Sequence, residues 1–169
     1  MKNLITAIAI FVLSNLSGSL IAQDVNRNFG IGLQKTAINL GLSIKYGVSD
    51  NIVLQGIVAP WSASAFGASI SLNYYGGKLI YRFPGEERNS AIVLDPYLFI
   101  GGGAIVLNSN LIESSINVVK SYMIGGGLEV FLARKIGLSL EVSYGKQDIL
   151  GFIAVNSTAI GGGVHFYFK

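Results

Sequence analysis

The segments PYLFIGGGAIVL (residues 96–107), SYMIGGGLEVFL (residues 121–132) and TAIGGGVHFYF (residues 158–168) share one pattern. Each sets the string IGGG in a run rich in Val, Ile, Leu, Phe and Tyr, most of which favour β-strands. Glycine weakens an ordinary strand, because it costs entropy and packs no side chain. Three such triplets therefore need a shared architectural reason, and we interpret them as parts of strands in one narrow closed barrel.

The first residues have the pattern of an export signal. Lys2 supplies a positive charge, an apolar run follows it, and small residues lead up to Ala22, as in a cleavable secretory signal peptide. We predict cleavage after Ala22, with Ser19 as the alternative, so residues 1–22 form the signal peptide and residues 23–169 the mature barrel. The chain has no cysteine, which excludes a lipoprotein anchor and a disulfide framework.

The composition is unusual for a soluble domain. Charged residues make up 12% of the chain and apolar residues 51%, whereas typical globular chains carry about 25% charged residues. No segment after the signal peptide approaches the roughly 18 uninterrupted apolar residues that a membrane helix needs. A membrane β-barrel accounts for both observations. The net charge of +3 is small and scattered, which argues against nucleic acid as a partner.

Alternation with a period of two predicts eight strands. Leu40, Leu42 and Ile44, for example, alternate with small or polar residues. Four strands alternate cleanly, over residues 38–46, 121–132, 136–145 and 158–168. Four alternate less cleanly, over residues 28–34, 51–59, 69–83 and 95–106. The sequence therefore predicts an all-β fold, an eight-stranded antiparallel up-and-down transmembrane β-barrel.

Residue size indicates which face of these strands points inward. One face carries Gly, Ser, Ala and a few ions, which suits a tight lumen, whereas the other is broadly apolar. A soluble barrel with the apolar face inward is the alternative. Aromatic residues favour an outward apolar face, since they gather at the rims as membrane-interface girdles do. We place at one rim Tyr46, Tyr81, Phe83, Phe166 and Phe168, and near the other Trp61, Phe66, Tyr122 and Tyr144.

The three glycine triplets lie at the same height when counted from the rim at which the chain ends. We expect small residues there to let eight strands curve tightly and to leave room for larger lumen side chains. Connections at this rim are predicted over residues 47–50, 84–94 and 133–135. Loops at the opposite rim are predicted over residues 35–37, 60–68, 107–119 and 147–157.

Strand number, short turns and the final segment STAIGGGVHFYFK (residues 157–169) resemble the small eight-stranded outer-membrane barrels, typified by the transmembrane domain of outer membrane protein A and by outer membrane protein X. In that family the assembly machinery reads a C-terminal strand with alternating aromatics. Val164, Phe166 and Phe168 match it, although Lys169 follows the last Phe. The resemblance covers the whole mature chain. It implies an outer-membrane location, a monomer, and as partners outer-membrane lipids, lipopolysaccharide and the outer-membrane assembly machinery.

Little in the sequence points to catalysis. The glycine triplets are not phosphate loops, because none is followed by Gly-Lys-Ser/Thr. His165, the only histidine, is predicted to face the lumen near the rim at which the chain ends, whereas lipid-modifying barrels place their histidine near the outer surface. One histidine and no cysteine offer no metal cluster beyond carboxylates. We expect no enzyme, cofactor or metal site, and a packed, hydrogen-bonded His165.

The lumen-facing ions form the candidate site. Strand parity places on the inward face Lys45, Lys78, Arg82, Glu129, Glu141 and His165. Buried charges are costly unless they are paired, so we expect Glu141 to meet Lys78. Glu129, which lies lower, should meet Arg82 or Lys45. We expect this network to plug the barrel above the inward aromatic residues Tyr97, Phe99, Phe131 and Tyr167. A charged, gated water path is the alternative.

Two functions are consistent with this interpretation. The first is a non-enzymatic integral outer-membrane protein with a plugged lumen and a structural or surface-interaction role. The alternative is a barrel with a lateral opening for the passage of small hydrophobic molecules. Apolar residues in the predicted outer loops, such as Trp61 and Phe66, and the lipid-facing Gly102 and Gly126 indicate this alternative. A lipid-modifying enzyme is the least favoured hypothesis.

Overall fold

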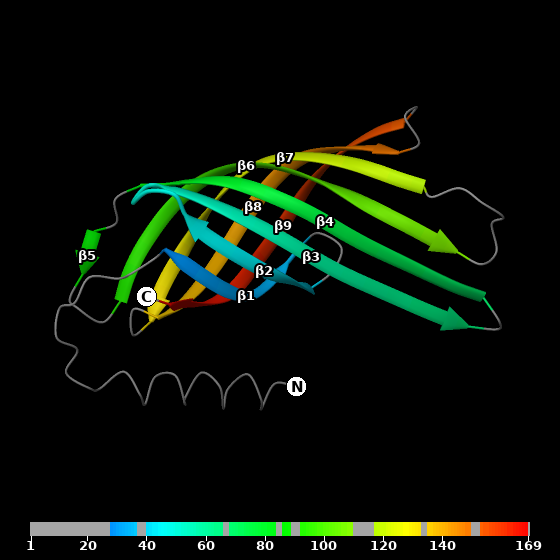
Figure 1. The fold of residues 1–169 in the computed structure, drawn as a ribbon. Helices are drawn as coiled ribbons and strands as arrows, with labels where there is room; N and C mark the ends of the chain where they lie inside the picture. The colour runs from blue at the N-terminus through cyan, green and yellow to red at the C-terminus, as the bar shows by residue number, and fades with distance from the viewer. Residues whose placement is uncertain are drawn as a thin grey trace, which may run out of the picture.

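The computed structural model describes residues 28–36, 40–65, 68–83, 86–88, 92–109, 117–132, 135–149 and 153–168 (Figure 1). The predicted signal peptide lies outside these residues. The strands in the described part of the chain are β1 (Phe29–Lys35), β2 (Leu40–Gly47), β3 (Ile52–Ala65), β4 (Ala68–Arg82), β5 (Glu86–Arg88), β6 (Ile92–Ser109), β7 (Asn117–Leu132), β8 (Ile136–Ile149) and β9 (Ile153–Phe168). None of the described segments is a helix long and apolar enough to cross a membrane.

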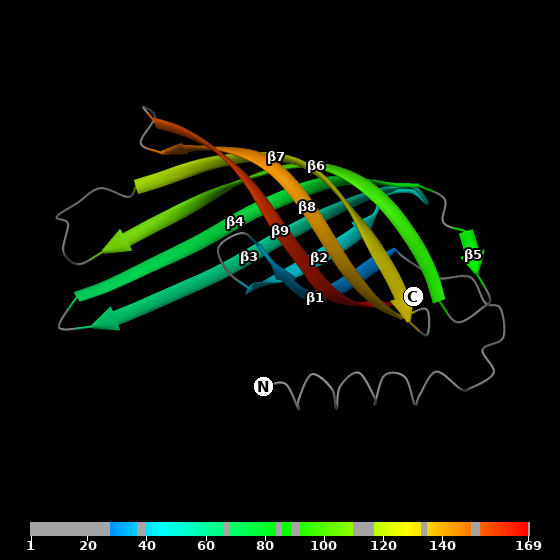
Figure 2. The same cartoon turned by 180° about the vertical axis from the view of Figure 1, so that it is seen from behind.

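Eight of these strands close into a barrel, seen from opposite sides in Figures 1 and 2. Neighbouring strands pair antiparallel, β4 pairs with β6, and β9 pairs back with β1. The predicted eight-stranded antiparallel barrel is thus confirmed. The alternation does not predict β5, a three-residue strand that pairs with the start of β6. It lies within the connection predicted over residues 84–94.

The strands run further than predicted toward the rim opposite the C-terminus. β3 continues to Ala65 and β4 begins at Ala68, so the loop predicted over residues 60–68 is wrong. Strands also take up the ends of the loops predicted over residues 107–119 and 147–157. Exposed side chains at the tip of β3 are those of Trp61, Ser62, Ala63 and Ser64. Because neither face is buried there, strand pairing leaves no period-two pattern in the sequence.

The outward face of the barrel is apolar. Leu42 and Ile160 are 65% and 68% exposed, whereas Ser43, next to Leu42, is buried. The same alternation runs along the barrel strands. The prediction that the apolar face points outward is confirmed, and an exposed apolar surface of this extent suits hydrocarbon rather than water.

Aromatic rings gather at the rim where the chain ends. The ring centroids of Phe29 and Phe168 are 6.2 Å apart, and those of Phe166 and Phe168 are 5.0 Å apart. Those of Tyr81 and Phe83 are 5.3 Å apart. These residues form one of the two predicted girdles, to which the structure adds Phe29. Exposed members of the other predicted girdle in the described residues are Trp61, Tyr122 and Tyr144.

The glycine triplets lie against large lumen side chains. Gly125 is opposite Phe99 in the sheet, and Gly127 is opposite Tyr97. A Cβ atom added to either glycine would lie 2.6 Å from the ring of its partner, closer than real side chains approach. The expectation that the triplets leave room for lumen side chains is confirmed.

Gly127→Ala is expected to lower the free energy of unfolding by about 1–3 kcal/mol, the usual cost of overpacking. The new methyl group would meet the ring of Tyr97 and the backbone carbonyl oxygen of Leu140. Gly56→Ala is the matched control, because no atom lies within 4 Å of its Cβ position. Urea unfolding of the refolded protein measures both changes, and equal effects would contradict the packing role of Gly127.

Candidate functional site

Two clusters of ionic side chains lie in the lumen. The upper cluster, farther from the rim at which the chain ends, is centred on the carboxylate of Glu141 in β8. Lys78 Nζ is 2.5 Å from Glu141 Oε2. Gln34 donates a hydrogen bond of 2.9 Å to the same oxygen, and the Tyr97 hydroxyl donates one of 2.9 Å to Oε1. Donors from β1, β4 and β6 therefore converge on one carboxylate of β8.

The lower cluster is centred on the carboxylate of Glu129 in β7. Lys45 Nζ is 2.8 Å from Glu129 Oε1, and the Tyr167 hydroxyl donates a hydrogen bond of 2.8 Å to the same oxygen. Arg82 Nη2 is 3.3 Å from Oε2 and also donates to the Tyr167 hydroxyl, at 3.1 Å. This carboxylate thus holds together β2, β4, β7 and β9 across the lumen.

Neutral polar side chains extend the upper cluster toward His165. The Gln55 amide donates to Gln34 Oε1 at 3.2 Å and to Ser43 Oγ at 2.8 Å. Ser43 Oγ is in turn 3.0 Å from His165 Nε2. His165 is fully buried. The histidine is therefore an inward, hydrogen-bonded member of the lumen packing, and it is placed far from the rim where a lipid-modifying site would need it.

The structure brings together the ions that strand parity places on the inward face. Lys78 contacts Glu141, and Glu129 contacts both of its expected alternatives, Lys45 and Arg82. All six candidate residues are buried. The alternation of side chains between the two faces of a strand is sufficient to predict this placement. Once one residue of a strand is assigned to the lumen, every second residue faces the lumen too.

Sequence reasoning missed three polar members of the lumen: Gln34, Gln55 and Asp95. Asp95 is fully buried in β6. It lies two residues before the inward Tyr97, and this spacing could have placed it on the inward face. Asp95, Glu129 and Glu141 give three acidic groups in the described lumen, against the three basic groups Lys45, Lys78 and Arg82. The formal charges balance. The two glutamines carry no charge, so the pairing argument does not single them out.

The inward aromatic rings interleave with the ions. Lys78 Nζ lies 4.4 Å from the centroid of the Phe99 ring, and the Arg82 guanidinium carbon lies 5.8 Å from the centroids of both Phe131 and Tyr167. The expectation that the network sits above these rings is therefore wrong. Tyr97 and Tyr167 donate directly to the two carboxylates, because the interior of an eight-stranded barrel is only wide enough for side chains, so rings and ions share the same space.

The arrangement can cross-link the barrel wall through its interior. Both central carboxylates accept hydrogen bonds from cations and hydroxyl groups, which offsets the cost of burying charge. In the described residues, no three His, Asp or Glu side chains gather closely enough to hold a metal ion. The described lumen side chains therefore connect the strands through ion pairs and hydrogen bonds.

The three residues that resemble an assembly signal lie on the outward face of β9. Val164, Phe166 and Phe168 are each about half exposed, at 50%, 44% and 44%. Phe168 pairs with Phe29 of β1 at the seam where the first and last strands close the barrel. Lys169 lies outside the described residues. Their role in assembly stays a prediction.

Comparisons with known proteins place the fold. No family model matches the chain, and no curated protein sequence matches it significantly. The N-terminal β-barrel domain of OprF from Pseudomonas aeruginosa matches over 83% of this chain and 95% of that chain, with 19% identity and a TM-score of 0.50. Ail, the attachment invasion locus protein of Yersinia pestis, matches over 82% and 93%, with 15% identity and a TM-score of 0.38. The chain therefore shares the barrel fold of the OprF domain.

Proposed function

We propose that this chain, which has the fold of the small eight-stranded outer-membrane barrels, is a non-enzymatic integral outer-membrane protein with a plugged lumen and a structural or surface-interaction role. The observation that carries the proposal is the pair of ionic clusters around Glu129 and Glu141. The interior of an eight-stranded barrel is only wide enough for side chains. Paired ions and aromatic rings therefore occupy the space that an aqueous path would need.

The membrane location is supported by the outward face. Exposing its apolar side chains to water would be costly. The girdle of aromatic residues at the rim where the chain ends suits the membrane interface. An export signal over residues 1–22 and an assembly signal in β9 complete the proposal. The partners are then outer-membrane lipids, lipopolysaccharide and the assembly machinery.

Fractionation tests the location. We expect the protein in outer membranes, with a gel mobility that changes on heating, because a closed barrel resists detergent at room temperature. The measurement is electrophoresis of heated and unheated membrane fractions. Recovery as a soluble periplasmic protein would contradict the proposal.

Conductance tests the plug. We expect no steady ion current through the protein in planar bilayers, because the buried ion pairs leave no continuous water path. Steady current from the native protein would favour the gated water path instead.

The alternative function, passage of small hydrophobic molecules, needs an opening in the wall. Gly102 and Gly126 do not provide one: Gly102 pairs with Gly77 and Tyr122, and Gly126 pairs with Leu98 and Val142. The observation that favours this alternative lies elsewhere, on the side of β1 and β2, where the wall is lower.

A further inference from the structure

The barrel wall has a notch above β1 and β2. These strands are joined by only four residues, 36–39. In Figures 1 and 2 they end well short of the tips of β3 and β4. β3 pairs with β2 only as far as Val58, and β9 pairs with β1 only from Gly162. β2 itself ends at Leu40, and its Gly41 lies against Ala59. Beyond the ends of β1 and β2, residues 61–65 and 153–160 have no described strand along that edge.

Pro60 supports an unpaired edge at this place. It lies in β3 two residues past the last pair with β2. Proline has no N–H to donate and is confined in sheets to edges, strand starts and bulges. Pro60 therefore marks the place where pairing of β3 with β2 ends.

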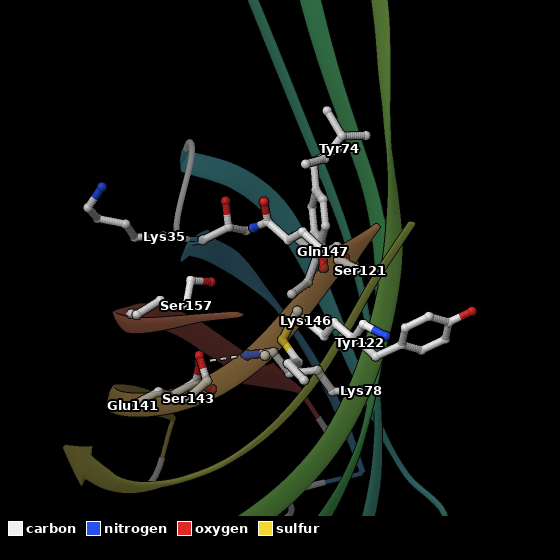
Figure 3. A pocket seen from close by; sticks show the side chains of 17 residues that line it. Lys35, Tyr74, Lys78, Ser121, Tyr122, Glu141, Ser143, Lys146, Gln147 and Ser157 are labelled. Carbon is white, nitrogen blue, oxygen red and sulfur yellow. Dashed lines mark hydrogen bonds and ion pairs between the residues drawn. The ribbon is translucent and has the colours of Figure 1, made fainter. Parts of the chain in front are cut away.

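A cavity lies behind the notch, above the upper ionic cluster (Figure 3). The space within it is about 670 Å³, a figure that includes the open solvent at its mouth. Ala159 and Gly161 of β9 line it next to the end of β1. The cavity therefore reaches the edge of the notch. The Lys78–Glu141 pair lies at its floor.

The two walls of the cavity differ in chemistry. Across β3, β4, β6 and β7 the wall is mostly apolar: Ile57, Tyr74, Ile105 and Met123 form it, together with Ser121. Across β8 and β9 the wall is polar. It carries Ser143, Gln147 and Ser157 between Glu141 at the floor and the exposed Lys146 at the margin. A molecule that satisfies both walls must itself have an apolar and a polar part.

The charged groups leave no place for an ionic ligand. Lys78 and Glu141 neutralise each other, and Glu141 is further engaged by Gln34 and Tyr97. Lys35 and Lys146 at the margin are exposed, and the Lys35 side chain points away from the cavity in Figure 3. An anion at the floor of the cavity would lie beside the Glu141 carboxylate, whereas the other two lysines that line the cavity, Lys35 and Lys146, lie at its margin.

We propose that this cavity binds a single-chain, uncharged amphiphile with a hydroxyl head, of the long-chain alcohol class, drawn from the membrane beside the notch. The alkyl chain lies against Ile57, Ile105 and Met123, and the hydroxyl group bonds to Ser143, Ser157 or Gln147. The inference rests on the proposed membrane location and goes beyond the proposed function. Because the ionic clusters close the floor, the cavity is a dead-end binding site and carries nothing through the barrel.

Photolabelling tests the proposal directly. The mature protein is refolded into phosphatidylcholine vesicles with dodecanol that carries a diazirine on its chain, and labelled residues are mapped by mass spectrometry. We expect saturable labelling of the inward residues Ile57, Ile105 and Met123, suppressed by excess plain dodecanol. Labelling confined to outward residues, or labelling that plain dodecanol does not suppress, would overturn the proposal.

Two variants and a charged competitor sharpen the test. Ala159→Phe fills the cavity and should weaken binding by about tenfold or more. Ser143→Leu adds a smaller side chain to the cavity and should weaken binding in the same way. Val142→Phe is the matched control, because Val142 is the exposed neighbour of Ser143 on β8 and is paired on both sides, away from the notch, and it should leave binding unchanged. Dodecanoate should compete about tenfold less well than dodecanol. Equal competition, or full binding by both filled variants, would refute the assigned ligand class.

The same vesicles separate this inference from the proposed function. The heat-dependent gel mobility and the absence of steady conductance report a folded, plugged barrel for the native protein and for each variant. If these hold while saturable labelling is absent, the ligand site is wrong and the plugged barrel stands. If they fail, the proposed function itself is wrong.

Discussion

Glu141→Gln is expected to lower the free energy of unfolding by about 3–5 kcal/mol, the usual result of breaking a buried ion pair on one side. The change removes the anion 2.5 Å from Lys78, which remains buried in the lumen. It also replaces an acceptor for Tyr97 and Gln34 by an amide whose one oxygen cannot serve three donors. Urea unfolding of the refolded protein, followed by gel mobility, measures the loss.

Adding Lys78→Met should recover part of this loss, because neither charge is then left without its partner. Lys135→Met, at an exposed turn lysine, is the matched control and should change stability by less than about 0.5 kcal/mol. Strictly additive effects of the Glu141 and Lys78 substitutions would show that the pair is not coupled. Together with a steady current through the native protein, additivity would replace the plug by an aqueous path.

The fold and most of the lumen network were predictable, because a strand alternates with a period of exactly two. Once the small face is assigned to the lumen, parity alone places Lys45, Glu129 and Glu141 inward. Height above the rim then indicates which of them can meet. The same rule applies to Asp95, and it was missed only because the strand was taken to begin there, whereas β6 begins at Ile92.

The upper part of the barrel was not predictable in the same way. Alternation records a difference between a buried and an exposed face, and at the tip of β3 both faces are exposed. Pro60 and the serines around it therefore look like a loop in the sequence. The notch exists because β1 and β2 are shorter than their neighbours. Only the pairing register shows how far each strand extends beyond the end of the next one.

The double substitution Phe166→Ser and Phe168→Ser is expected to cause a several-fold loss of protein from the outer membrane and its degradation in the periplasm. Both rings lie on the outward face of the closing strand. Their loss removes about 1.5–3 kcal/mol of apolar burial per ring, and it also removes two of the three residues that resemble the assembly signal. Immunoblots of membrane and periplasmic fractions measure the loss.

The matched control separates assembly from simple loss of burial. Tyr122→Ser with Tyr144→Ser removes two aromatic rings from the outward face near the opposite rim, where they are 57% and 54% exposed. If the two double variants refold equally well from urea into vesicles but only the Phe pair fails to reach the membrane in cells, β9 carries an assembly signal. Equal membrane levels in cells would show instead that the end of the chain acts only through the interfacial girdle.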